Sequence, residues 1–166
     1  MIKIHEINNF NSSCDTHNKN ELSFKIADLV NFNMTHENKN NTYSKDEIEN
    51  LSRNKTAESM EELIGRSYLV YLTNEKNEII GCGMVVKQDG LYFAKTLHIR
   101  SDYRGLGYAQ QICDLREDFL RSIGANEIYI ESLKYPKTIE FHKKRGFKEA
   151  PNYRELKYTI LMKKDL

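Results

Sequence analysis

The chain has 166 residues, of which 39% are hydrophobic and 30% are charged, and its formal net charge is only +1. This composition is typical of one soluble globular domain over residues 1–166, and it argues against a disordered chain and a strongly basic nucleic-acid binder. The apolar runs are strand-sized, below the roughly 18 residues of a membrane span, and the first residues lack the layout of a signal peptide. We therefore expect a cytoplasmic protein with no membrane partner.

The cysteines are widely spaced and form no C-x-x-C pair: Cys14, Cys82 and Cys113. This spacing argues against a disulfide framework and against a structural zinc site, so we expect reduced thiols and no bound metal. Cys82 and Cys113 lie in apolar segments without a recognisable base beside them, which predicts small core residues rather than nucleophiles.

Charge is distributed unevenly along the chain. Residues 1–65 hold seven Lys and Arg against eleven Asp and Glu, a balance of −4, whereas residues 134–166 hold ten against four, a balance of +6. Charged residues that cluster by chance on solvated surfaces explain this distribution as well as a binding function does. The functional interpretation places an anionic cofactor toward the basic end and a cationic substrate toward the acidic end.

The first residues predict a strand and then a helix. Alternating isoleucines indicate a half-buried strand over residues 1–7, and a polar loop follows over residues 8–20. Apolar residues from Leu22 to Val30 recur at helical spacing. This helix fades in the Asn-rich residues 38–41, which we interpret as a surface connection.

Two shorter helices come next. Ser44 and Glu47 form the S-x-x-E pattern of a capping box, so a second helix begins near Lys45. A third helix carries Met60 and stops at Gly65.

From residue 67 the apolar period becomes strand-like. Polar turns separate three runs that form an antiparallel meander, over residues 68–73, 78–86 and 91–99. A helical stripe follows Gly107 and ends at Gly124, a typical glycine of a helix C-terminus.

The remaining elements are a strand, a short helix and a closing strand. The strands are predicted over residues 128–130 and 158–162, and the helix begins at Pro136 and ends at Gly146. The order of all these elements predicts a mixed α+β fold.

Residues 97–109 run from a strand through a tight turn into a long helix. Gly105 and Gly107 let the backbone come close to a ligand, and the first N–H groups of the helix are unpaired at its positive dipole end. This geometry favours a diphosphate. An ordinary β–α turn with glycines for shape is the alternative.

The same segment resembles motif A of the GNAT N-acetyltransferase superfamily, R/Q-x-x-G-x-G/A after a strand ending in an L-x-V-x-P-like run. Ser101 replaces the common proline. The matching positions are Leu97, Ile99, Arg104, Gly107 and Ala109.

A second run, over residues 135–147, resembles the family pattern N-x-x-A-x-x-F-Y-x-x-x-G-F. It matches at Phe141, Gly146 and Phe147, and it departs at Tyr135, Thr138 and His142. The resemblance spans roughly residues 67–164, and the first third of the chain carries no motif.

The resemblance implies a GNAT fold: a central, mostly antiparallel twisted sheet of six to seven strands, splayed at the acyl-CoA site and flanked by about four helices. It implies acetyl-CoA as co-substrate, with the pyrophosphate on backbone amides and the pantetheine arm beside the strand. No metal is implied. The residues placed at the cofactor are Leu97, Ile99, Arg104, Gly105, Leu106, Gly107, Tyr108, Ala109, Tyr135, Thr138 and Phe141.

The resemblance also assigns catalytic groups. The backbone N–H at or next to Ile99 is expected to stabilise the oxyanion that forms on the acetyl group. His142 replaces the tyrosine thought to be the acid in many members, and a histidinium of pKa about 6.5 is a stronger acid than a thiol of about 8.5. If His142 only lines the cofactor, the acid is Tyr135, Tyr108 or water.

Two further side chains have open roles. Glu131 shares a strand face with Tyr129 and is either a relay for the amine's proton or an exposed strand-end glutamate. His98 lies opposite to Leu97 and Ile99 on its strand, so it either packs in the core or contacts the acceptor.

We therefore expect an enzyme that transfers an acetyl group directly to a primary amine of a small cationic molecule, a protein or a peptide. Two alternatives are a non-catalytic acyl-CoA sensor and a toxin-like acetyltransferase acting on aminoacyl-tRNA. No basic-aromatic array suited to RNA is evident, so nucleic acid is not an expected partner. A homodimer is left open.

Overall fold

The computed structural model describes residues 1–10, 19–37, 42–151 and 156–166. Most of the polar loop expected over residues 8–20 lies outside the described residues, as do Cys14 and the Asn-rich connection at residues 38–41. Across the described ranges, no helix combines the length and the apolar character needed to cross a membrane.

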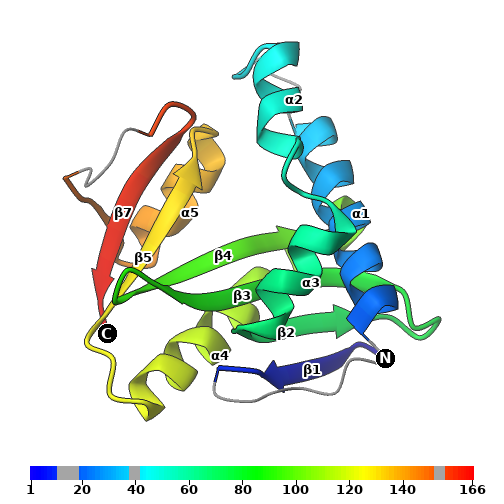
Figure 1. Cartoon of the computed structure of the whole chain (residues 1–166), viewed down its shortest axis with the longest axis horizontal. Coiled ribbons are helices and arrows are strands. Elements are labelled where there is room, and N and C mark those ends of the chain that lie inside the picture. Colours follow the sequence, from blue (N-terminus) through cyan, green and yellow to red (C-terminus); the bar gives the residue numbers. More distant parts are fainter. Residues whose placement is uncertain (11–18, 38–41, 152–155) are drawn as a thin grey trace.

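The strands predicted from alternation are present, together with a two-residue strand near the C-terminus. They are β1 (Lys3–Asn8), β2 (Ser67–Thr73), β3 (Ile79–Gln88), β4 (Leu91–Ile99), β5 (Glu127–Leu133), β6 (Lys148–Glu149) and β7 (Thr159–Asp165). They form one sheet in the order β1-β2-β3-β4-β5-β7-β6 (Figure 1). Neighbouring strands are antiparallel except β4 and β5, which run parallel.

Five α-helices lie in the described part of the chain, where about four were expected. They are α1 (Lys19–Glu37), α2 (Lys45–Ser52), α3 (Ala57–Gly65), α4 (Tyr108–Ser122) and α5 (Pro136–Lys144), and a 3₁₀ turn covers Ser101–Tyr103. The predicted capping box is confirmed, because the Ser44 hydroxyl accepts from the Glu47 N–H while the Glu47 carboxylate accepts from the Ser44 N–H. The mixed α+β fold is thus confirmed.

The sheet separates two apolar layers. On one face, α4 packs against alternate residues of β2, such as Val70 and Leu72. On the other face, α1 and α3 pack against the intervening Leu69 and against Cys82 of β3. Figure 1 shows α4 and the pair α1 and α3 on opposite sides of the sheet. Burial on both faces explains why β2 and β3 read as nearly continuous apolar runs.

The sheet splays between β4 and β5. Within the described residues, the two strands share one registered position, Phe93 opposite Tyr129, and Figure 1 shows them diverging from that end. We call the facing edges of β4 beyond Phe93 and of β5 beyond Tyr129 the β4–β5 opening. The α4 layer lies on one side of it and the α1 and α3 layer on the other.

Candidate active site

The turn before α4 has the geometry of an anion cradle. Gly105 and Gly107 have φ angles of +76° and +81°, which L side chains rarely adopt. A Cβ added at either glycine meets no protein atom within 4 Å. Packing therefore does not require glycine here, whereas the backbone conformation does, and the space above the turn is open to a ligand.

The amides of this turn have no acceptor in the described part of the protein. Among the described residues, no N–H group from Gly105 to Ala109 donates to a protein acceptor, and Gly107 is the N-cap of α4. Leu106 is 60% exposed between the two glycines. A row of free N–H groups at the positive end of a 15-residue helix fits a diphosphate.

The backbone of Ile99 faces the β4–β5 opening. The next N–H along the chain, that of Arg100, donates to the Ile80 carbonyl of β3 at 2.8 Å. Because strand peptides alternate, the N–H and C=O of Ile99 point to the other edge, toward β5. The Ile99 carbonyl there accepts from Asn33 Nδ2 at 3.0 Å and from Arg104 Nε at 2.9 Å. Its N–H has no registered partner on the described part of β5.

A β-bulge lies just before this position, at Thr96 and Leu97. Cys82 is paired with His98 but Met84 with Lys95, so β4 carries one extra residue against β3. Thr96 adopts a φ of +60° there, a strained conformation for a β-branched residue that is typical of functional sites. No sequence pattern signals this bulge, and it was not predicted.

Side chains on both faces hold the bulged peptides. The Lys95 carbonyl accepts from Arg116 of α4 at 3.4 Å, and the Thr96 carbonyl accepts from the Cys82 thiol at 3.4 Å. Burial raises the pKa of the Cys82 thiol to about 12, which agrees with the prediction of a core residue rather than a nucleophile.

His142 lies on the α4 and α5 side of the sheet and is only 7% exposed. Burial, with the Arg116 and Arg145 cations nearby, lowers its pKa to about 4. At neutral pH the ring is therefore uncharged, which removes the resting histidinium on which the acid role rests. Its Nδ1 is buried and has no hydrogen-bond partner in the described structure.

Arg116 is a buried cation that sequence reasoning missed. The side chain is 3% exposed, and it donates to the Met84 carbonyl at 3.4 Å and to Cys113 Sγ at 3.0 Å. The signal that could have found it is its spacing, because Arg116 falls within the apolar stripe of α4, between Ile112 and Leu120.

The other side of the opening carries three titratable groups. Strand alternation places His98 of β4 and Glu131 of β5 on the α1 and α3 face, opposite to Ile99 and Ile130. Lys55, from the connection between α2 and α3, lies near both. Burial lowers the pKa of Lys55 while the Glu131 carboxylate opposes that shift. Burial, Lys55 and Arg104 lower the pKa of His98 to about 3.

These three half-buried groups have the chemistry of a site that could bind an acceptor amine. They bring a carboxylate, a neutral imidazole and an ammonium to one place. His98 and Glu131 were candidates from the sequence, whereas Lys55 was not, because nothing in a loop lysine signals its surroundings.

Tyr135 is the N-cap of α5, and Thr138 and Phe141 lie half-buried within this helix. Tyr135 is buried at the N-cap, where its ring meets the edge of the Tyr43 ring at 5.2 Å. The Tyr43 hydroxyl in turn accepts from the Lys134 N–H at 2.6 Å. These contacts connect the start of α5 to the residues that precede α2.

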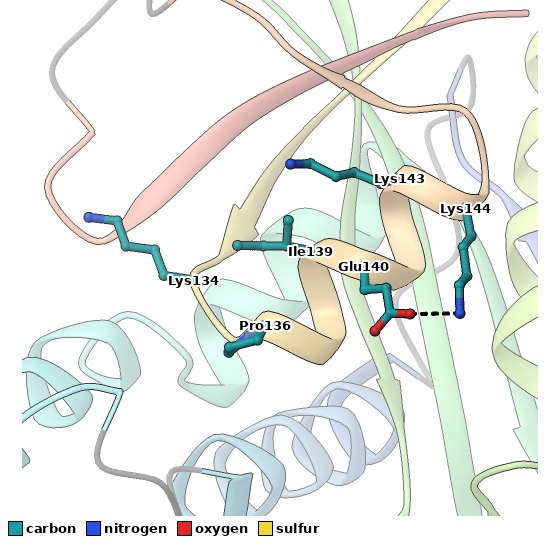
Figure 2. A pocket seen from close by; sticks show the side chains of 6 residues that line it. All are labelled: Lys134, Pro136, Ile139, Glu140, Lys143 and Lys144. Atoms are coloured by element: carbon teal, nitrogen blue, oxygen red, sulfur yellow. Dashed lines mark ion pairs between the residues drawn. The ribbon is translucent and has the colours of Figure 1, made fainter.

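An open hollow of about 640 Å³ lies on the outer face of α5. Figure 2 shows its side chains on α5 and at Lys134 just before it, and none of the predicted site residues lines the hollow. The lining residues are Lys134, Pro136, Ile139, Glu140, Lys143 and Lys144. Lys144 pairs with Glu140 at 2.7 Å and Lys143 with Glu149 at 3.2 Å, so the two α5 lysines of this hollow are partly neutralised.

Several cations of the basic C-terminal segment form ion pairs with acids elsewhere in the protein. Arg145 and Lys164 both bind the buried Glu117, at 2.7 Å each, and Lys163 binds Glu127 at 2.5 Å. Part of the positive balance of residues 134–166 thus serves internal ion pairs.

The chain belongs to the Acetyltransferase (GNAT) family, whose sequence model matches residues 32–147. The match begins inside α1, well before residue 67, where the resemblance was expected to begin. A comparison with curated protein sequences finds no match.

Solved structures with the same fold are numerous. One is the PaiA N-acetyltransferase from Thermoplasma acidophilum in complex with coenzyme A, with a TM-score of 0.76 and 15% identity over 100% of this chain and 99% of that one. Another is aminoglycoside 6′-acetyltransferase type Ii, with a TM-score of 0.66 and 21% identity over 98% and 96% of the two chains. An aminoglycoside 6′-N-acetyltransferase complexed with coenzyme A gives a TM-score of 0.65 and 18% identity over the same shares. The fold is thus the GNAT fold, and the family makes the chain an acyltransferase.

Proposed function

We propose that this protein transfers the acetyl group of acetyl-CoA directly to a primary amine, with both substrates bound together. The row of free amides from Gly105 to Ala109 carries the proposal, because it offers hydrogen-bond donors at a helix N-terminus to a diphosphate. Acetyl-CoA supplies the activated acetyl group as a thioester. The residues that would hold it are the turn from Arg104 to Ala109, the β4 edge at Leu97 and Ile99, and Tyr135, Thr138 and Phe141 of α5.

Separate groups of the protein would stabilise the oxyanion, position the peptide and relay the proton. Ile99 directs its N–H at the β4–β5 opening, where a developing oxyanion needs a fixed donor. Asn33 and Arg104 hold the Ile99 carbonyl from two sides and so fix this peptide. The acceptor amine, with an ordinary pKa near 10.4, must lose a proton before attack, and Glu131 is the carboxylate placed to relay that proton through water.

The acceptor is a small cationic amine or a protein or peptide amino group. Glu131 and the acidic balance of residues 1–65 support a cationic acceptor. Two of the similar structures are aminoglycoside acetyltransferases, so aminoglycosides belong in the first panel, beside polyamines and lysine peptides.

The cradle can be tested with a matched pair of glycines. Gly107 and Gly124 lie at the two ends of α4, have φ angles of +81° and +77°, and would each direct a Cβ into open space. Alanine at either site should therefore cost a similar 1–2 kcal/mol or so of stability. Only Gly107→Ala places a methyl group in the cradle, so only it should lose CoA affinity, by about tenfold or more.

Calorimetry with CoA on the wild type and both variants provides the measurement. No CoA binding by the wild type, or an equal loss in both variants, contradicts the cradle. Thiol release from acetyl-CoA in the presence of the amine panel then tests transfer itself, and binding without release would favour an acyl-CoA sensor.

A further inference from the structure

Lys55 brings a cation to the α1 and α3 side of the β4–β5 opening, which we call the acceptor side. Its backbone is fixed, because its N–H donates to the Ser52 carbonyl at 2.8 Å and its carbonyl accepts from Asn31 Nδ2 at 2.9 Å. The side chain is half-buried, yet Nζ remains open to solvent. Within the described residues, Nζ forms no hydrogen bond or ion pair. Lys55 is therefore a positioned cation without a partner in the described structure.

His98 faces the same side from β4. Its ring nitrogens have no hydrogen-bond partner in the described part of the chain, and they too remain open to solvent. Burial, with the Lys55 and Arg104 cations nearby, lowers the pKa of His98 to about 3. The ring is therefore neutral at neutral pH and offers one N–H donor. A ligand that reaches Lys55 thus meets an uncharged donor beside the ammonium.

The acceptor side carries two cations and one carboxylate. Lys55 and Arg104 both act on His98, and Glu131 of β5 acts on Lys55. Lys55 and Glu131 are thus close enough to influence one another, but no ion pair joins them in the described structure. A molecule that carries both signs of charge can bridge such a separated pair.

A ligand with positive charges only is less complementary to this arrangement. A diamine that binds Glu131 brings its second cation toward Lys55 and Arg104, which repel it. An amine that also carries a carboxylate avoids this repulsion. Its ammonium meets Glu131, while its carboxylate meets the Lys55 ammonium and the His98 N–H in charge-assisted hydrogen bonds.

These groups lie next to the peptide proposed to bind the oxyanion. On α1, Asn31 holds the Lys55 carbonyl, and Asn33, two residues further, holds the Ile99 carbonyl at 3.0 Å. One stretch of α1 therefore positions both the lysine and the Ile99 peptide. His98 precedes Ile99 on β4. A carboxylate bound at Lys55 thus keeps an amine a few bonds away beside the acetyl group.

We propose that the acceptor is an amine with a carboxylate a few bonds away, as in a free amino acid, and that Lys55 binds this carboxylate. The inference rests on the proposed function, whose acceptor class it narrows. Glu131 holds the ammonium and relays one of its protons to solvent. The neutral nitrogen then bonds to the acetyl carbon, and the C–S bond breaks with its electron pair on sulfur. A second proton of the amine ends on that sulfur, and Lys55 takes up none.

Acceptors that differ only in the carboxylate test the proposal. The protein amino acids are compared with their carboxamides, and lysine also with cadaverine, which lacks the carboxyl group. Thiol release from acetyl-CoA gives kcat/KM for each acceptor. We expect the preferred amino acid to exceed its amide by about tenfold or more, mainly through KM. Deprotonation cannot produce this order, because an adjacent amide lowers the pKa of the amine and favours the amide.

Three variants separate binding of the carboxylate from a structural role. Lys55→Met should lower kcat/KM for the amino acid by about tenfold or more and leave its amide unchanged or improved. Lys55→Arg retains the charge and should keep most of the preference. Arg53→Met removes an exposed cation two residues away and should leave the preference unchanged. A structural role for Lys55 would instead lower the rates of acid and amide alike.

Glu131→Gln provides the opposite control. Both the amino acid and its amide carry the ammonium, so this variant should weaken the two acceptors to the same extent, within about twofold. A selective loss of the amino acid in Glu131→Gln would contradict the assignment of the carboxylate to Lys55.

The outcomes separate the two proposals. If CoA does not bind the wild type, or if no amine releases its thiol, the proposed function fails and this inference fails with it. If amines are acetylated but those without a carboxylate react as well as amino acids, only the carboxylate site is overturned. That wild-type comparison is decisive even if Lys55→Met does not fold. A preference that persists in Lys55→Met overturns the role of Lys55.

Discussion

On the α4 and α5 side of the β4–β5 opening, the groups nearest the bulge are buried, and Arg116 has no carboxylate partner in the described structure. On the α1 and α3 side, His98, Glu131 and Lys55 are half-buried and mixed in charge. Charges on the first side are held in place by burial and are little screened by salt, whereas charges on the second side are partly solvated and therefore weaker in their effect.

The largest expected effect that tests this comparison is a loss of stability when the buried side is titrated with acid. The pKa of His142 is lowered to about 4 in the folded protein from an ordinary 6.5, so on acidification the unfolded chain takes up the proton first. The stability that His142 contributes is complete above pH 6.5 and is lost as the pH falls toward about 4, on the order of 3 kcal/mol at most.

Urea unfolding of the wild type and of His142→Phe, from pH 7 down to about pH 4.5, measures this slope. The variant should lose part of the acid dependence and keep the part due to His98, whose pKa is lowered to about 3. An unchanged slope would show that His142 titrates freely in solution. If His142→Phe also keeps normal turnover with an unchanged pH profile, His142 is not the acid.

The next largest effect is expected at the Ile99 peptide, which lies between the two sides of the opening. Asn33 is 1% exposed, and its Nδ2 donates to the Ile99 carbonyl at 3.0 Å. Asn33→Leu should destabilise the fold by about 2 kcal/mol, because a buried carbonyl loses a donor, and should lower kcat by about tenfold through the misplaced Ile99 N–H.

Asn31→Leu is the matched control for that measurement. Asn31 lies on the same helix, but its Nδ2 donates to the Lys55 carbonyl at 2.9 Å. Chemical denaturation and initial rates of the two variants can be compared directly. An equal loss of kcat in both would mean that α1 acts only through general stability.

A smaller effect is expected on the acceptor side. Glu131→Gln should raise KM for a cationic amine by about fivefold, and Lys55→Met should lower it, because the two charges act on the amine with opposite signs. Both changes should shrink at high salt, since the groups are partly solvated. KM measured at two ionic strengths, with CoA affinity as the internal control, tests this. Effects of the same sign would place one of the two residues outside the acceptor site.

The smallest effect is predicted for the outer hollow of α5. Lys143→Ala and Lys144→Ala should leave both CoA affinity and turnover within about twofold of the wild type, because their charges are exposed and already paired. A clear loss of CoA affinity in either variant would extend the cofactor site around α5.

The secondary structure followed from the sequence because periodicity, caps and turn residues are local signals. The S-x-x-E box at Ser44 and the glycine after α4 are examples, and both were placed correctly. The cradle was predicted for the same reason, since the glycines at 105 and 107 report a backbone conformation directly.

The rest of the candidate site depends on tertiary contacts that no local pattern encodes. Thr96 at a φ of +60° gives no signal, because its strain is maintained by Arg116 and Cys82 from distant segments. The pKa of His142 likewise depends on burial between helices. No local pattern at the basic end of the chain indicates that Arg145, Lys163 and Lys164 pair with Glu117 and Glu127, which are remote in sequence.

The single registered position between β4 and β5, Phe93 opposite Tyr129, has a consequence for cooperativity. It leaves β1–β4 and β5–β7 as two subsheets whose hydrogen-bond ladders are nearly independent, joined mainly by helix packing. If acetyl-CoA binds as proposed, with its arm along β4, the arm would act as a missing strand between them. We therefore expect thermal unfolding to be broad or biphasic without coenzyme A and to sharpen into one transition when it is bound.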